Sequence, residues 1–205
     1  MTLGAEIWNE FNRILRTEIG DNLIAYYTQV LFEQATRAYD AGVHLGSAVL
    51  CRSSLETAFF LFLYGRWDRG EFHVDNPKNQ KGERIRVSFE ALKKKIIARV
   101  TFSKRELEGI DNVQDHGNLV AHFATLRIEG IQGWEKDILR ETTQLLQLNP
   151  TPEGWSQLKE RLRRASGTWV TPLEALDDLR DTSSILQTFF KEVIRQQRAS
   201  MLTVT

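Results

Sequence analysis

The stretch GIDNVQDHGNLVAHF, residues 109–123, decides the fold that the sequence predicts, because its pattern is that of one helix with two different faces. At about 3.6 residues per turn, an apolar stripe surrounds Gly117 and consists of Leu107, Ile110, Val113, Val120 and Ala124. Beside it lies a polar row, formed by Asp111, Asp115, Asn118 and His122. A half-buried helix with carboxylate, amide and imidazole groups in one row is a candidate site for chemistry.

Helical periodicity also dominates the rest of the chain. Apolar residues recur at helical spacing over residues 3–40, with a break at 20–22, and over residues 43–64, 85–100 and 171 to about 198. Capping boxes that start helices are formed by Ser103 with Glu106 and by Thr171 with Glu174. These patterns predict an all-α bundle of five or six helices, with a loop over residues 65–83 and no strand.

Length and composition favour a single domain over residues 1–205. A hydrophobic fraction of 41% suffices for a substantial core, and residues 130–167 are predicted to form a helical insertion. Lys and Arg together number 27, as do Asp and Glu, so any contact with nucleic acid has to come from a local patch. Cys51 is the only cysteine, which excludes a disulfide framework and a thiolate zinc site.

No part of the sequence has the pattern of a secretory signal or of a membrane span. The first residues lack a basic region followed by an apolar run. The most apolar run, Ala58–Tyr64, is far shorter than the ~20 residues that cross a bilayer. We therefore expect a soluble, cytoplasmic protein without a membrane partner.

The polar row of residues 111–122 has two interpretations. It is either a solvated helix face or a site, and Gly117 favours the site, because glycine costs roughly 1 kcal/mol within a helix unless close packing or a ligand requires it. In the site, His122 would act as a general acid or base near neutral pH. Asp111, Asp115 and His122 match no zinc signature in their spacing, so neither a metal nor another cofactor is predicted.

Two motifs resemble the HEPN superfamily of helical domains. They are SAVLCRSSLE (47–56), which contains Arg-x-x-Leu-Glu, and GNLVAH (117–122), which has the form Gly-Asn-x-x-Ala-His. More narrowly, they are similar to an uncharacterised HEPN-like branch that often accompanies restriction and other defence systems. The resemblance covers residues 38–127 and 171–195. It implies that the two motif helices pack together, that a long final helix closes the bundle, and that the domain forms homodimers.

The resemblance also implies a reaction, which the ribonucleases of the superfamily carry out without a metal. In them an arginine, usually followed by asparagine, precedes a histidine by four to six intervening residues. The histidine activates the ribose 2′-hydroxyl and the arginine handles phosphate. Asn118 and His122 match this pattern, but Asp115, His116 and Gly117 stand where the arginine is expected. An aspartate repels phosphate and a glycine has no side chain to offer.

Arg52 is the residue that would replace the missing arginine. It lies one helical turn before Glu56, on the same face of its helix. On one interpretation, Arg52 and Glu56 join Asn118 and His122 in a catalytic site. On the other they are structural: Arg52 and Glu56 form an intrahelical pair, or Glu56 braces the helix around Gly117. The sequence leaves both open.

Basic clusters provide candidate contacts to nucleic acid, and the alternative is a solvated helix face. The residues in question are Lys93, Lys94, Arg161, Arg163 and Arg164.

Two functions follow from these features. The first is a non-catalytic or degenerate HEPN-like interaction and assembly module of a prokaryotic defence or nucleic-acid-processing system. It would form a homodimer and bind RNA or a partner protein. The alternative is a metal-independent HEPN-type endoribonuclease that uses His122 with Asn118 and Arg52.

Overall fold

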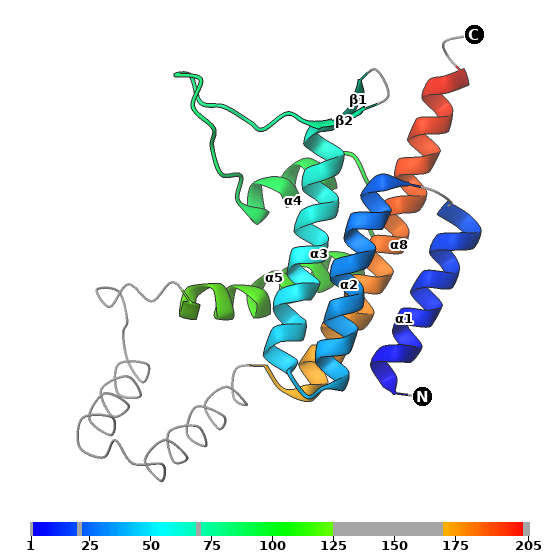
Figure 1. Ribbon diagram of the computed structural model, residues 1–205, viewed down its shortest axis with the longest axis vertical. Coiled ribbons are helices and arrows are strands. Elements are labelled where there is room, and N and C mark those ends of the chain that lie inside the picture. Colours follow the sequence, from blue (N-terminus) through cyan, green and yellow to red (C-terminus); the bar gives the residue numbers. More distant parts are fainter. Residues whose placement is uncertain (1, 20–21, 69–70, 125–169, 203–205) are drawn as a thin grey trace, which may run out of the picture.

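The computed structural model describes residues 2–19, 22–68, 71–124 and 170–202, which form a helical bundle (Figure 1). The elements in chain order are α1 (Leu3–Ile14), the π-helix η1 (Leu15–Ile19), α2 (Leu23–Asp40), α3 (His44–Tyr64), β1 (Gly65–Asp68), β2 (Glu71–Val74), α4 (Phe89–Ile97), α5 (Lys104–Ala124) and α8 (Pro172–Leu202). The all-α prediction is confirmed, with one small two-stranded sheet added. The insertion expected over residues 130–167 lies outside the described residues.

Helix α3 is the centre of the bundle and packs against α2, α4, α5 and α8. Figure 1 shows α2 and α8 running beside it, while α5 crosses it. By length and composition alone α3 meets the criterion for a membrane span, which the core helix of a soluble protein also meets. Seven of its residues are buried: Ser47, Ala48, Cys51, Ser54, Leu55, Ala58 and Phe59.

Aromatic side chains connect the helices inside the core. Phe59 on α3 meets Phe189 on α8 with ring centroids 5.4 Å apart, and Phe11 meets Phe32 across α1 and α2 at 4.8 Å. All four side chains are fully buried. Burying an aromatic side chain of this size contributes on the order of 2–3 kcal/mol, so these rings largely determine how the helices pack.

The capping residues identified in the sequence begin the helices as expected. Glu106 accepts hydrogen bonds from the backbone N–H of Ser103 and from its hydroxyl, both at 2.8 Å. Its other carboxylate oxygen accepts one from the Thr188 hydroxyl of α8. The cap of α5 therefore also ties this helix to α8 and helps to position the polar row.

The segment between α3 and α4 differs from the prediction. Residues 65–83 were expected to be a loop, but β1 and β2 pair within it as an antiparallel hairpin. The next helix was expected over residues 85–100 and instead spans Phe89–Ile97. It begins late because the Ser88 side chain caps it, accepting a hydrogen bond from the N–H of Ala91 at 3.2 Å.

Candidate functional site

The two motif helices meet where Arg52 of α3 lies across Gly117 of α5. A Cβ atom on Gly117 would stand 2.5 Å from Cδ of Arg52 and 2.7 Å from its Cβ. No side chain fits at such distances, and the neighbouring atoms include the Cβ of Arg52, which moves only with the backbone. Close packing of α3 on α5 therefore explains the glycine.

The guanidinium group of Arg52 is held within the protomer. Its Nη2 atom lies 3.7 Å from Oε2 of Glu56, and its Cζ atom lies 5.8 Å from the centre of the Phe89 ring. The side chain is 16% exposed, and its buried Nε atom has no hydrogen-bond partner among the described residues. The intrahelical pair that the sequence left open is present, and the buried N–H of the guanidinium remains unsatisfied.

A pocket of about 290 Å³ lies beside this arginine, between α3, α5 and the start of α4. It brings together three of the four predicted catalytic residues, namely Arg52, Glu56 and Asn118. Gln114 also lines the pocket, and its buried Oε1 atom has no partner among the described residues. These two unsatisfied atoms are closed to solvent, so they are buried polar groups of residues that line the pocket and not contacts on its open surface.

His122, the fourth predicted residue, follows Asn118 by one turn of α5. Its backbone belongs to the described part of this helix, but its side chain lies outside the described residues, as do Arg161, Arg163 and Arg164. The catalytic role of His122 and the basic cluster after residue 160 stay predictions.

Lys93 and Lys94, the other residues predicted to bind nucleic acid, lie in different environments. Lys93 donates to Asp111 of the polar row and forms an ion pair with Glu90, both at 2.8 Å, and its side chain is 17% exposed. Burial lowers the pKa of Lys93, but the hydrogen bonds to these carboxylates outweigh it and raise the pKa. Lys94 is exposed. Only Lys94 of the two is accessible to a phosphate.

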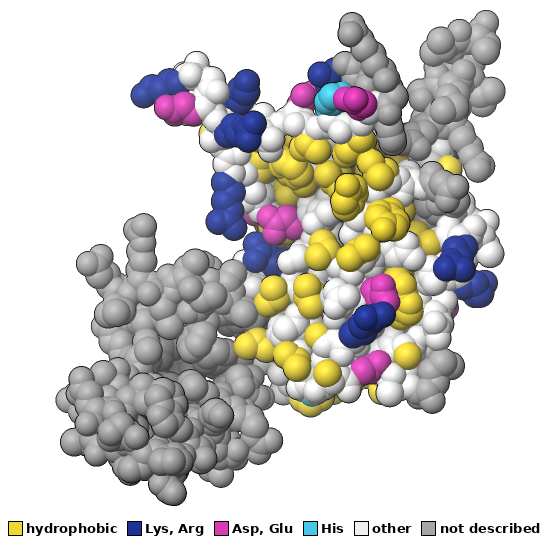
Figure 2. All heavy atoms as spheres, in the orientation of Figure 1, with side chains coloured by type: hydrophobic (Ala, Val, Ile, Leu, Met, Phe, Trp, Pro, Cys, Tyr) yellow, Lys and Arg dark blue, Asp and Glu magenta, His cyan; other side chains and the backbone are white. Residues whose placement is uncertain are grey.

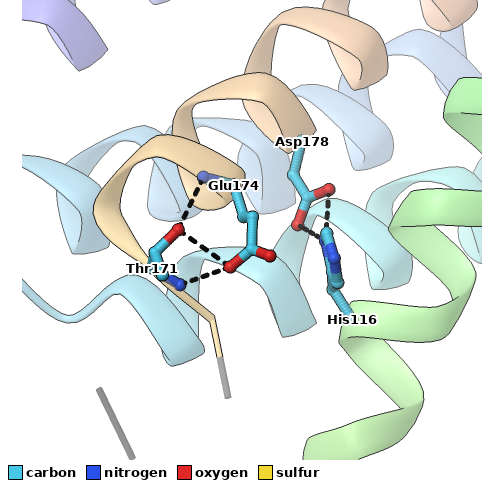
Figure 3. Close-up of polar contacts among 4 residues, drawn as sticks. All are labelled: His116, Thr171, Glu174 and Asp178. Carbon is cyan, nitrogen blue, oxygen red and sulfur yellow. Dashed lines mark hydrogen bonds and ion pairs between the residues drawn. The ribbon is translucent and has the colours of Figure 1, made fainter. Parts of the chain in front are cut away.

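A second polar cluster connects α5 to α8 (Figure 3). Nδ1 of His116 lies 2.9 and 3.0 Å from the two carboxylate oxygens of Asp178, whose side chain is 1% exposed against 20% for His116. The hydrogen bond to Asp178 raises the pKa of His116 against the opposing effect of burial. Burial raises the pKa of Asp178, and the imidazole partly offsets this. The pair satisfies a carboxylate that would otherwise be costly to bury.

The start of α8 lies beside this pair. Glu174 accepts hydrogen bonds from the backbone N–H and hydroxyl of Thr171, at 2.7 and 2.8 Å, and donates its own N–H to the Thr171 hydroxyl (Figure 3). These hydrogen bonds lower the pKa of Glu174, whose negative charge in turn helps to raise the pKa of His116. The second capping box is therefore confirmed.

Sequence reasoning missed Asp178, Arg86 and Gln114, and it gave His116 no role. One signal for Asp178 exists in the sequence, because Asp178 and Thr182 fall in the apolar stripe of α8 together with Ala175 and Leu179. A carboxylate in such a stripe needs a partner. The partner, on α5, is identified only by the tertiary structure.

The single cysteine lies in the core, away from the pocket. Cys51 is fully buried, and burial together with the charge of Asp178 raises the pKa of its thiol, which keeps it in the unreactive protonated form. No group of three or more His, Cys, Asp or Glu side chains suited to a metal ion occurs in the part of the chain that the structure describes.

No known family model matches the sequence, and comparisons with curated proteins and with solved structures find no match either. The resemblance to HEPN domains therefore stays a prediction.

Proposed function

We propose that this protein is a non-catalytic HEPN-like interaction module that assembles with a second copy of itself in the cytoplasm. It would serve a prokaryotic defence or nucleic-acid-processing system. The observation that carries this proposal is the exposed apolar face that α2 forms beside α3. Arg52 supports it as well, because its contacts with Glu56 and Gly117 make it a structural brace within one protomer.

The apolar face is centred on α2. The side chains of Tyr26, Tyr27 and Val30 are 61%, 50% and 44% exposed. Figure 2 shows hydrophobic side chains gathered over α2 and α3, interrupted by few charges. The adjoining α3 carries further partly buried apolar residues that pack against the core, among them Leu50, Phe60, Leu61 and Tyr64. Exposed apolar side chains, aromatic ones above all, are characteristic of protein–protein interfaces.

The first experiment measures the mass of the purified protein by analytical ultracentrifugation at micromolar concentration. The wild type should sediment as a dimer, at twice the protomer mass of 23.7 kDa. A variant with Tyr27→Asp and Val30→Asp should sediment as a monomer, because two carboxylates cannot be buried in an apolar interface. Leu173→Asp, on α8 and 65% exposed, is the matched control and should remain dimeric. A monomeric wild type, or a dimeric double variant, would contradict the proposal.

A second function is favoured by the pocket that contains Arg52, Glu56 and Asn118. It is metal-independent RNA cleavage, in which His122 would transfer the proton of the ribose 2′-hydroxyl. Asn118 would position the scissile phosphate and Arg52 would stabilise its charge. This role requires Arg52 to turn its guanidinium group from Glu56 toward the substrate.

The test incubates the protein with a labelled single-stranded RNA in the presence of EDTA. If the protein is a ribonuclease, His122→Ala should abolish cleavage. The exposed His73, far from α5 in the chain, provides the control His73→Ala, which should cleave normally. Absence of cleavage by the wild type, or equal cleavage by both variants, would leave assembly as the function.

A further inference from the structure

A strongly basic segment stands out on a chain without net charge. Residues 76–95 contain seven Lys or Arg against two Glu, whereas the whole chain has 27 of each sign. Four of the seven lie on residues 77–86, here called the basic arm: Lys78, Lys81, Arg84 and Arg86. Figure 1 shows this segment projecting from the bundle before it descends to α4, and Figure 2 shows basic side chains along it.

The basic arm has a defined conformation. Asn79 Oδ1 accepts hydrogen bonds from the backbone N–H groups of Lys81 and Glu83, at 2.9 and 3.0 Å. Gly82 adopts a φ of 79°, which favours glycine, and Lys78 pairs with Arg84 in an antiparallel bridge. A turn built in this way presents its charged side chains in a fixed arrangement.

The cations of the arm are available to a ligand. Lys78, Lys81, Arg84 and Arg86 are exposed, and no described carboxylate forms an ion pair with any of them. Glu83, the one carboxylate of the arm, accepts a hydrogen bond from the Asn79 side-chain amide at 2.8 Å. Lys93, by contrast, is neutralised by Glu90 and Asp111. The arm therefore carries four cations against one carboxylate and keeps a net positive charge.

The arm leads directly into the pocket beside Arg52. Arg86, Val87 and Ser88 form one of its walls. Arg52 and Gln114 also line the pocket, and each has one polar atom, Nε and Oε1 respectively, that is buried without a partner among the described residues. The pocket volume of about 290 Å³ equals roughly ten water molecules at about 30 Å³ each, enough for one nucleobase.

We propose that the basic arm and this pocket together bind single-stranded nucleic acid. Phosphates contact the arm, and one unstacked base enters the pocket, which is lined by the polar side chains of Arg52, Gln114 and Asn118. A duplex fits less well, because its bases are stacked and their pairing edges are occupied. This binding site goes beyond the assembly role. None of the arm residues belongs to the apolar face of α2, so the proposal of assembly and the proposal of single-strand binding can fail independently.

The test measures fluorescence anisotropy of labelled single-stranded oligouridylate and oligodeoxythymidylate, and of a duplex of equal length, at several salt concentrations. The arm variant carries Lys78→Gln, Lys81→Gln and Arg84→Gln. It should bind the single strands at least about tenfold more weakly at low salt. The slope of log affinity against log salt should fall by about 2, since each phosphate contact contributes about 0.7 on a single strand.

The matched control removes the same number of exposed cations elsewhere, through Arg37→Gln, Lys104→Gln and Arg180→Gln. It should bind within about twofold of the wild type, because phosphate contacts act locally. Gln114→Leu should weaken binding of single strands while leaving the salt slope unchanged, because it alters the pocket and no cation. Circular dichroism melts verify that each variant is folded.

Several outcomes would overturn the proposal. They are a wild type that binds no oligonucleotide, an arm variant that binds as tightly as the control, and a preference for the duplex. A competition experiment would also overturn it if heparin displaces the labelled strand as well as unlabelled oligonucleotide does at the same concentration of negative charge. Such a result would show a general surface for polyanions. The monomeric α2 variant should retain single-strand binding, which separates failure of the assembly proposal from failure of this one.

Discussion

Gly117 shows how one residue determines the crossing of two helices. In an isolated helix an alanine would be more stable by about 1 kcal/mol, so the glycine needs a reason. The reason is the Arg52 side chain, which occupies the space where a Cβ atom would lie. The same contact holds Arg52 beside the pocket and restricts the direction in which its guanidinium group can point.

Gly117→Ala should therefore destabilise the protein. Overpacking at this contact is expected to lower the free energy of unfolding by about 1–3 kcal/mol in urea titrations. Gly46→Ala in α3 is the control, since the only atoms within reach of its new Cβ belong to the Val43 side chain. An unchanged or higher stability of Gly117→Ala would show that α3 and α5 have room to separate.

His116 is the residue through which pH should act on stability. Its pKa is raised in the folded protein, so its protonated form favours folding. That contribution is complete below the unfolded value of about 6.5 and is lost as pH rises through the higher folded value. The raised pKa of Asp178 acts in the same direction at lower pH, because the folded state again binds the proton more tightly.

Thermal melts across this range should reveal the effect. The melting temperature of His116→Gln should lie furthest below that of the wild type at about pH 6, and the gap should narrow as the pH rises through the raised pKa of His116. His73→Gln, at an exposed position in β2, should follow the wild type at every pH. A gap that stays constant or widens with pH would contradict the raised pKa.

At the scale of elements, the start of α8 depends on a reciprocal cap. Thr171 and Glu174 satisfy each other's polar groups, and the same turn lies beside His116 (Figure 3). Because α8 also packs on α1, α2, α3 and α5, its first turn affects the whole bundle.

Thr171→Ala should lower the free energy of unfolding by about 1 kcal/mol, equivalent to about 2–4 °C in melting temperature. Thr171→Ser keeps the hydroxyl group and should restore most of this loss. If the two variants melt at the same temperature, the hydroxyl does not stabilise the helix.

At the scale of the whole molecule, the core encloses Cys51 completely. The thiol lies on the central helix α3 at 0% exposure, and it is the only cysteine of the chain. A reagent can reach it only when α3 separates from its neighbours, so its reaction rate reports on opening of the bundle.

Labelling with Ellman's reagent should be slow in the native protein and complete in denaturant. The native rate should rise with urea in parallel with the unfolding curve measured by circular dichroism. Rapid labelling without denaturant would show that the α3–α8 contact opens locally and that the core is less closed than described.

The sequence by itself determined the helical class, the capped starts of α5 and α8, and the candidate residues on the two motif helices. These depend on periodicity and on hydrogen bonds between residues three or four apart, which the chain order contains. The tertiary structure alone decided that Arg52 crosses Gly117, that His116 meets Asp178, and that the basic arm leads into the pocket. Such contacts join residues distant in the chain, and only the packing of helices brings them within reach.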